Sequence, residues 1–278
     1  MKISKPLSNK PRPFLKWAGG KRQLISQMKK YFPKSFETYI EPFVGGGAVF
    51  FHILPPKAIL MDINKELINC YKVVKENVFE LIELLKNHKN EKNYYYKIRA
   101  KDRNQKEYEK LSDVEKASRM IYLNRCCYNG LYRVNRKGQF NVPFGKYKNP
   151  KFCDKENLLS VSKVLQDIRI IQGSFESCLK YANQNDFIYF DPPYQPISET
   201  SSFTSYSKED FNKKSQVKLF NVFKTLDEKG CRLMLSNSNN DFLLNLYKDY
   251  KIIFLNAKRA INSVATKRGN IKEILVLN

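Results

Sequence analysis

One short stretch, DFIYFDPPY at residues 186–194, constrains the fold of this chain more than any other. Its four apolar or aromatic residues, Phe187–Phe190, predict a strand buried on both faces, and such strands belong to parallel sheets covered by helices on each side. Pro192 and Pro193 cannot donate to a sheet ladder, so the strand ends before them. Asp191 is therefore expected at the carboxyl edge of the sheet, where open α/β folds bind ligands.

The rest of the chain alternates as such a sheet requires, with one interruption. Residues 1–75 read as strand, helix, strand, helix, and strand patterns return after Asp154 at 168–172, 187–190, 232–236, 250–256 and 272–277. The last two strands could pair as a hairpin. A helix is also expected to begin near Lys21. We therefore predict one α/β domain formed by residues 1–75 and 154–278.

Residues 76–153 have a different character and are interpreted as an inserted domain. Aromatic and basic residues are frequent there, and residues 101–110 are highly charged. A helix is predicted over 113–127, and Gly138 between two strand-like runs indicates a hairpin.

A glycine turn, EPFVGGGAVFF, lies between the first strand and its helix. Gly45 and Gly47 lack a Cβ, which lets a ligand approach the backbone. Asp62 ends the next strand, 17 residues after Gly45, near the spacing at which an acid accepts from ribose hydroxyls. Phe50 stands where a dinucleotide fingerprint has its third glycine, so an adenosine cofactor without a pyrophosphate fits better than a nicotinamide dinucleotide.

The DPPY motif offers chemistry for a planar amino group. The nitrogen of an exocyclic amine on a base is a poor nucleophile, because its lone pair is delocalised into the ring. Asp191 could accept one N–H and the Pro192 carbonyl the other, which frees the lone pair, while the prolines fix that carbonyl. Tyr194 offers a ring on which the base could stack. The alternative is an aspartate that merely caps a turn.

The charge balance indicates a polyanionic partner. Lys and Arg number 50 against 27 Asp and Glu, a net charge of +23, although a codon bias towards lysine explains part of the excess. The stretch 128–148 interleaves cations with aromatic rings, a mixture suited to phosphates and bases, and a hairpin can enter a major groove. The alternative is a solvated charged hairpin.

Other features narrow the class of protein. The six cysteines include no CxxC pair and the two histidines lie far apart, so neither a metal site nor a disulfide framework is expected. No apolar run approaches the length of a membrane span, and the amino terminus has no apolar signal core. A cytoplasmic protein is the expectation.

Six motifs in this order, FLKWAGGK, EPFVGGGAVFF, NGLYRVN, FNVPFGKY, DPPY and LSNS, resemble the Dam-type DNA adenine methyltransferases, most closely the methylases of DpnII-type restriction-modification systems. The resemblance implies a Rossmann-like, S-adenosylmethionine-dependent methyltransferase sheet with an inserted, mostly helical target-recognition domain that bears a β-hairpin. It also implies methylation of adenine N6 in double-stranded DNA, within GATC, without a metal. A cognate restriction endonuclease, acting on the same site without direct contact, is a further expected partner.

The resemblance also assigns roles to individual residues. The cofactor residues would be Trp17, Lys21, Gly45, Gly47, Asp62, Phe175 and Asp191. Asp191, Pro192 and Tyr194 would hold the flipped adenine. Ser174 stands where many relatives have aspartate, so a hydroxyl would replace that polar contact. Among the DNA-binding residues, Tyr128 and Asn129 would fill or flank the gap left by the base, Lys16, Leu131, Arg133 and Pro143 would read the outer target bases, and Lys146, Tyr147 and Lys148 would contact phosphates.

Several alternatives share these motifs. DPPY is also compatible with cytosine N4, adenine in RNA, or a protein glutamine amide as the acceptor. An alternative from another functional class is a catalytically dead methylase homologue that only binds DNA. This alternative is disfavoured by the presence of Lys21, Asp62, Asp191 and Tyr194. A nicotinamide oxidoreductase is the remaining alternative and is disfavoured by Phe50.

Overall fold

The computed structural model describes residues 10–193, 211–258 and 270–278. Its strands are β1 Tyr39–Glu41, β2 Ala58–Asp62, β3 Arg169–Gln172, β4 Phe187–Phe190, β5 Arg232–Ser238, β6 Lys251–Lys258 and β7 Asn270–Leu277. They form a seven-stranded sheet in the order β3-β2-β1-β4-β5-β7-β6. Neighbouring strands from β3 to β5 are parallel, whereas β7 is antiparallel to both β5 and β6. The predicted pairing of the last two strands is confirmed.

Helices precede, connect and cover the strands. The α-helices are α1 Ile25–Met28, α2 Phe50–Ile53, α3 Lys65–Glu76, α4 Val78–Lys86, α5 Lys92–Ala100, α6 Gln105–Glu109, α7 Asp113–Cys126, α8 Lys155–Leu165, α9 Lys213–Glu228 and α10 Asp241–Leu246. The 3₁₀ turns are η1 Lys21–Gln23, η2 Lys29–Tyr31, η3 Lys101–Arg103, η4 Tyr128–Gly130 and η5 Phe175–Lys180. The expected helix near Lys21 is thus a series of short turns rather than one continuous helix.

The central strand β4 is buried on both faces, as its sequence predicts. Phe187 and Tyr189 belong to the apolar core on one side of the sheet, together with residues of α3, α4, α7 and α8. Ile188 and Phe190 belong to the core on the other side, with residues of α9 and α10. The side chains of a strand alternate between faces, so four consecutive apolar residues supply both cores.

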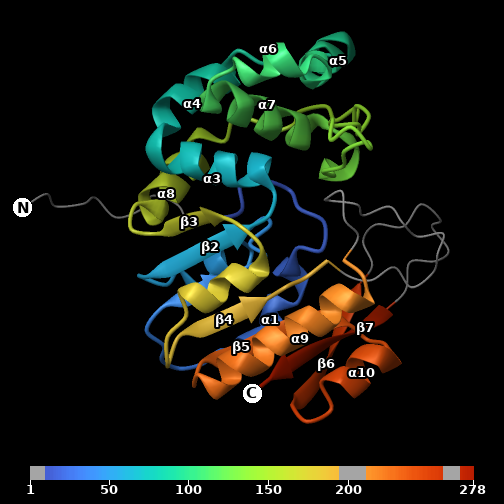
Figure 1. Cartoon of the computed structure of the whole chain (residues 1–278). Coiled ribbons are helices and arrows are strands. Elements are labelled where there is room, and N and C mark those ends of the chain that lie inside the picture. The colour runs from blue at the N-terminus through green and yellow to red at the C-terminus, as the bar shows by residue number, and fades with distance from the viewer. Residues whose placement is uncertain (1–9, 194–210, 259–269) are drawn as a thin grey trace, which may run out of the picture.

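The segment 76–153 is mostly helical, as predicted, and contains no strand of the main sheet. Figure 1 shows α4–α7 gathered at the end of the molecule opposite α9 and α10. The longest of them, α7, begins with a capping box in which Ser112 accepts from the Glu115 backbone and Glu115 accepts from the Ser112 backbone. Helices α4 and α7 pack into the same apolar core as α3, so whether this segment is a separable domain stays a prediction.

The predicted hairpin around Gly138 is present but short. Val134 and Phe140 form an isolated antiparallel bridge, and Asn135 donates its backbone N–H to the Gln139 carbonyl at 2.9 Å. Gly138 has φ +77°, a conformation that glycine adopts without strain.

Candidate active site and nucleic-acid interface

The strand order places three carboxyl side chains at one edge of the sheet. Because β2, β1 and β4 are parallel neighbours, their carboxyl ends meet at the same edge. Asp62 is the last residue of β2, Glu41 the last residue of β1, and Asp191 comes directly after β4. Sequence reasoning identified Asp62 and Asp191 but missed Glu41. A signal for it existed, because Glu41 precedes a proline at the end of a buried strand, as Asp191 does.

Asp191 is paired with a buried lysine from the amino-terminal motif. Lys21 Nζ lies 2.7 Å from Asp191 Oδ1 and 4.0 Å from Glu273 Oε2, and the lysine side chain is only 3% exposed. Lys21 also donates to the Gly19 carbonyl at 2.8 Å. Burial raises the pKa of Asp191 to about 6, although the charge and hydrogen bond of Lys21 act in the opposite direction. At neutral pH Asp191 is therefore mainly a carboxylate whose orientation Lys21 fixes.

Asp62 is held by the backbone of the glycine turn. The Gly45 N–H donates to Asp62 Oδ2 at 3.1 Å, and the Asn64 N–H donates to Oδ1 at 2.9 Å. Burial raises the pKa of Asp62 to about 6, while these backbone hydrogen bonds lower it. The Asn64 side chain also caps α3 by accepting from the Leu67 backbone. The carboxylate is therefore rigidly placed at the start of that helix.

Glu41 is buried and has a tyrosine hydroxyl as its partner. Its residue is 2% exposed, and Tyr39 Oη donates to its Oε2 at 2.8 Å. Burial raises the pKa of Glu41 well above its usual range, against the lowering effect of the Tyr39 hydrogen bond, and the charge of Asp191 raises it further. Between Asp62 and Asp191 the edge therefore carries a third carboxyl group whose charged form burial disfavours.

The glycine turn is packed against side chains of the protein itself. Gly45 has φ +48°, and a Cβ there would lie 2.7 Å from Cδ1 of Trp17. Gly47 has φ +69°, and its Cβ would lie 2.7 Å from the hydroxyl of Tyr71, which donates to the Gly45 carbonyl at 3.1 Å. The sequence interpretation gave these glycines to a ligand. The close approach of Trp17 and Tyr71 already explains why these two positions require glycine.

Aromatic side chains lie at both ends of this edge. Phe175, which begins η5 after β3, stacks on Phe43 with ring centroids 5.4 Å apart, and Phe211 packs edge-on against both rings. Sequence reasoning missed Phe43. Ser174 donates to the Glu176 carboxylate at 3.0 Å. At the other end Trp17 stacks on Tyr132 of the 76–153 segment at 5.4 Å, which joins the amino-terminal motif to that segment.

Lys16 lies among residues of the 76–153 segment. The buried Asn124 side chain accepts from the Lys16 N–H at 2.8 Å and donates to the Lys16 carbonyl at 2.8 Å. Lys16 Nζ lies 4.5 Å from the centre of the Tyr147 ring, and the Lys16 side chain occupies the space that a Cβ on Gly130 would need. Burial, followed by the charge of Arg125, lowers the pKa of Lys16. Asn124 is a positioning residue that sequence reasoning missed.

Tyr128, Asn129 and Pro143 also lie together. Tyr128 is 53% exposed, unusual for so large a ring, and its backbone N–H donates to the Pro143 carbonyl at 2.8 Å. Asn129 has φ +55° and is followed by Gly130 with φ +64°, so the chain turns sharply beside the exposed ring.

The remaining predicted DNA-binding residues are spread along the hairpin and the chain after it. Arg133 donates from Nε to the Asn141 side chain at 2.7 Å, which orients its guanidinium across the hairpin. Leu131 is partly buried against the apolar cluster of the 76–153 segment. Lys146 has φ +55°, and the side chain of Asn90 donates to the Tyr147 and Lys148 carbonyls. Tyr194 lies outside the described residues.

Within ranges 10–193, 211–258 and 270–278, no helix is long and apolar enough to cross a membrane. In the same part of the chain, no group of three or more His, Cys, Asp or Glu side chains could hold a metal ion.

The fold is that of a Rossmann-like methyltransferase, with acids and aromatic rings at the carboxyl edge of a mostly parallel sheet. Comparison with known proteins identifies the family. The family model for the D12 class N6 adenine-specific DNA methyltransferases matches residues 17–261. The chain belongs to this family and is an adenine-specific DNA methyltransferase.

Relatives match over nearly the whole length. The chain is 50% identical to the Type II methyltransferase M1.LlaDCHI of Lactococcus lactis, over 96% of this chain and 95% of the relative. It is 47% identical to the Type II methyltransferase M.MjaIII of Methanocaldococcus jannaschii, with coverages of 96% and 99%. The DNA adenine methylase of Escherichia coli is 36% identical, with coverages of 96% and 95%.

Proposed function

We propose that this enzyme transfers a methyl group from S-adenosylmethionine to N6 of an adenine in double-stranded DNA, within GATC, after the adenine has been turned out of the duplex. The observation that carries this proposal is the placement of Asp191. It is a carboxylate fixed by Lys21 at the carboxyl edge of the sheet, directly before a rigid Pro-Pro turn.

Residues at the edge fit an adenosine cofactor. Each Asp62 oxygen accepts one backbone N–H, and a carboxylate has about four acceptor sites, which leaves capacity for ribose hydroxyls. Phe43 and Phe175 offer apolar surface for a base next to the end of β2, because Gly173 donates its backbone N–H to the Asp62 carbonyl. S-adenosylmethionine would supply the methyl group from its sulfonium. We assign Trp17 and the glycine turn to its pocket, with the glycines at the methionine end.

Asp191 and Pro192 would activate the acceptor amine. The Asp191 carboxylate accepts one N–H of the adenine amino group and the Pro192 carbonyl accepts the other. This pair of hydrogen bonds draws the nitrogen towards tetrahedral geometry and localises its lone pair. Lys21 holds Oδ1, so Oδ2 remains for the amine. The carboxylate polarises the amine rather than removing its proton. As the N–C bond forms, the C–S bond of the sulfonium would break with its electron pair going to sulfur, and the methylated nitrogen would then lose its extra proton to solvent. Tyr194 is proposed to stack on the base.

The insert would supply the DNA contacts. An adenine within a duplex cannot reach the edge of the sheet, so it has to be extruded at a cost of a few kcal/mol. The exposed ring of Tyr128 and the turn at Asn129 would fill or flank the gap that the base leaves. Lys16, Leu131, Arg133 and Pro143 are proposed to read the outer bases, and Lys146, Tyr147 and Lys148 to contact phosphates.

The biological setting is part of the same proposal. Two relatives are named Type II methyltransferases, so we propose that the enzyme modifies DNA alongside a restriction endonuclease that acts on the same site without direct contact. Because the substrate is chromosomal DNA, we expect the enzyme in the cytoplasm.

A labelled-methyl assay tests the proposal directly. The enzyme is incubated with methyl-labelled S-adenosylmethionine and with either of two duplexes that differ only at a single GATC. The expected result is label in the GATC duplex alone, recovered as N6-methyladenine after digestion to nucleosides. Equal label in both duplexes would refute the GATC assignment. Label in N4-methylcytosine would refute the acceptor, and no label in either would refute the donor or the substrate.

A further inference from the structure

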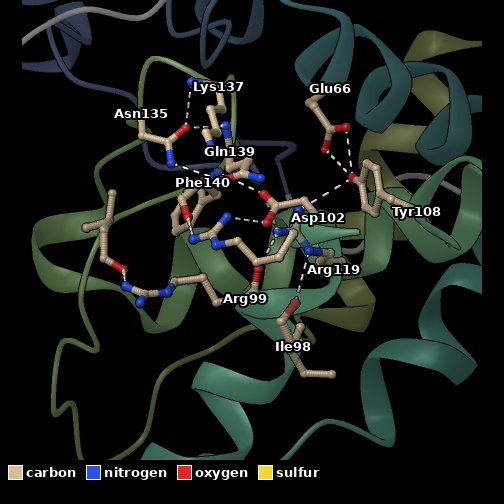
Figure 2. Close-up of polar contacts among 12 residues, drawn as sticks. Glu66, Ile98, Arg99, Asp102, Tyr108, Arg119, Asn135, Lys137, Gln139 and Phe140 are labelled. Carbon is tan, nitrogen blue, oxygen red and sulfur yellow. Dashed lines mark hydrogen bonds and ion pairs between the residues drawn. The ribbon is translucent and has the colours of Figure 1, made fainter. Parts of the chain in front are cut away.

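A buried polar cluster forms hydrogen bonds with the hairpin that we assign to target recognition (Figure 2). At its centre is Asp102 in η3, the turn between α5 and α6, where it is 7% exposed. Asp102 Oδ2 accepts the backbone N–H of Phe140 at 2.8 Å. Phe140 is the residue that pairs with Val134 to close the hairpin. A carboxylate buried in the helical layer is therefore bonded to the backbone of the hairpin's returning strand.

Arg103, the residue after Asp102, also binds the Phe140 backbone. Arg103 donates from Nη2 to the Phe140 carbonyl at 2.7 Å and from Nη1 to the Asp102 carboxylate. Both backbone polar groups of one hairpin residue are thus bound by two consecutive residues of η3. Hydrogen bonds of this kind have strict directional requirements, so they fix the rotation and register of the strand as well as its position.

A second arginine anchors the carboxylate to the longest helix of the insert. Arg119 of α7 lies with Nη2 2.7 Å from Asp102 Oδ2, and its side chain is 5% exposed. Arg119 also donates to the Ile98 carbonyl at 3.0 Å and to the Arg99 carbonyl at 2.9 Å, at the end of α5. The carboxylate therefore joins α5, α7 and the hairpin at one point, as Figure 2 shows.

The cluster extends to the helix that begins beside Asp62. Tyr108 of α6 lies with its hydroxyl 2.8 and 2.9 Å from the two oxygens of Glu66 on α3, and Arg119 Nη1 donates to the same hydroxyl at 3.4 Å. The N-cap of helix α3, Asn64, lies two residues after Asp62. The hairpin is thus connected by a continuous polar chain to the helix that follows the proposed cofactor acid.

We propose that Asp102 and Arg103 are positioning residues for sequence discrimination: they set the register of the 133–141 hairpin and so the accuracy with which Arg133 meets the target bases. The inference rests on the proposed function of this hairpin. A two-stranded hairpin is marginally stable by itself, and this one has a single bridge pair, so its geometry depends on contacts from outside. Asp102 is buried and negatively charged, which suits a structural acceptor and not a contact to phosphate.

The test uses Arg103→Ala, with Lys101→Ala as the matched control. Arg103 is 35% exposed and its removal leaves the Asp102–Arg119 ion pair intact, so the variant is expected to fold. Lys101 is an exposed cation in the same turn and controls for the lost charge. The readouts are kcat/KM on a GATC duplex relative to a duplex changed at one outer base, amide hydrogen exchange in 133–141, and the salt dependence of DNA binding.

We expect Arg103→Ala to lower the discrimination ratio about tenfold, equivalent to about 1.4 kcal/mol. The Asn135, Gln139 and Asn141 amides should exchange about tenfold faster. The salt slope should match that of Lys101→Ala, which keeps the wild-type ratio and exchange. Unchanged exchange would overturn the proposal, and so would faster exchange with an unchanged ratio. An equal loss on both duplexes, with a salt slope lower by about one than that of the control, would instead assign Arg103 to a phosphate.

A second variant and a second measurement separate this inference from the proposed function. Asp102→Asn removes the buried charge, so its folding is first checked by denaturant unfolding, and a folded variant should show the same loss of discrimination. If the wild type methylates neither duplex, the proposed function fails. The ratio is then measured by competition of the two duplexes for binding, where an unchanged ratio in Arg103→Ala overturns the positioning role independently.

Discussion

Replacement of Lys21 by methionine should shift the pH dependence of methyl transfer. Methionine keeps the length of the side chain in a site where lysine is only 3% exposed, but it removes the positive charge 2.7 Å from Asp191 Oδ1. An opposite charge this close lowers a carboxyl pKa by about 1–3 units. Without Lys21 the pKa of Asp191 should therefore rise from about 6 to about 8, and the nearby carboxylate of Glu273 acts in the same direction.

The size of the effect follows from the two pKa values. A group with a pKa of about 6 is ionised in about nine-tenths of molecules at pH 7, whereas one with a pKa of about 8 is ionised in about one-tenth. If the carboxylate is the active form, transfer by Lys21→Met should be about tenfold slower at pH 7 and should recover by about pH 9. The acid limb of the rate profile should move upward by about two units.

Single-turnover methylation of a GATC duplex between pH 5 and 9.5, at saturating cofactor, measures this limb. Cofactor affinity is determined separately by calorimetry, because Lys21 is also assigned to the cofactor pocket. Arg22→Met is the control, since it removes an exposed cation from the adjacent position and should leave the limb in place. A limb that stays near pH 6 in Lys21→Met, or a rate that does not recover at pH 9, would refute the role of Asp191 ionisation.

Three further substitutions test the site. Asp191→Asn should lower the single-turnover rate by about 10²–10³-fold, the usual cost of losing a preorganised electrostatic contact, with the salt slope of DNA binding unchanged in a filter assay. Glu41→Gln should keep near wild-type activity at pH 7, because burial already disfavours the charged form of Glu41 and the glutamine oxygen can still accept from Tyr39 Oη. Since its folded pKa is raised, folded Glu41 binds more protons than the unfolded chain above pH 4.5, and its contribution to stability falls as pH rises; urea unfolding should show a weaker decline in Glu41→Gln. Arg133→Ala should relax target choice by about 1–3 kcal/mol at one base, measured as kcat/KM across single-base duplex variants. The backbone hydrogen bond from the Asn141 N–H to the Arg133 carbonyl does not involve the Arg133 side chain, so the variant is expected to fold.

Local patterns predicted a large part of this protein. Four apolar residues before Asp191 indicated a strand with two buried faces, and β4 contributes to both cores. The capped helix at 113–126 and the turn at Gly138 were also readable, because capping and positive φ are properties of a few adjacent residues. The apolar spacing near Lys21 did not predict the short turns that replace the expected helix there.

Contacts between distant residues were beyond the sequence patterns. Lys21 and Asp191 are 170 positions apart, and no local pattern assigns one to the other. That Glu41 lies between Asp62 and Asp191 depends on the strand order, which no local pattern supplies. The approach of a ligand to the glycine turn stays a prediction, whereas the side chains that approach it in the structure, Trp17 and Tyr71, come from elsewhere in the chain.

The sequence by itself determined which residues end the strands and therefore which acids face the ligand edge, because backbone periodicity and proline act over a few positions. The tertiary structure alone decided the state of those acids. Burial raises the pKa of Asp191 to about 6 against the opposing charge of Lys21, whereas burial raises the pKa of Glu41 well above its usual range. It also decided how the hairpin is held. Asp102 binds the Phe140 backbone and the Arg119 side chain, and so it joins three segments that only the folded chain brings together.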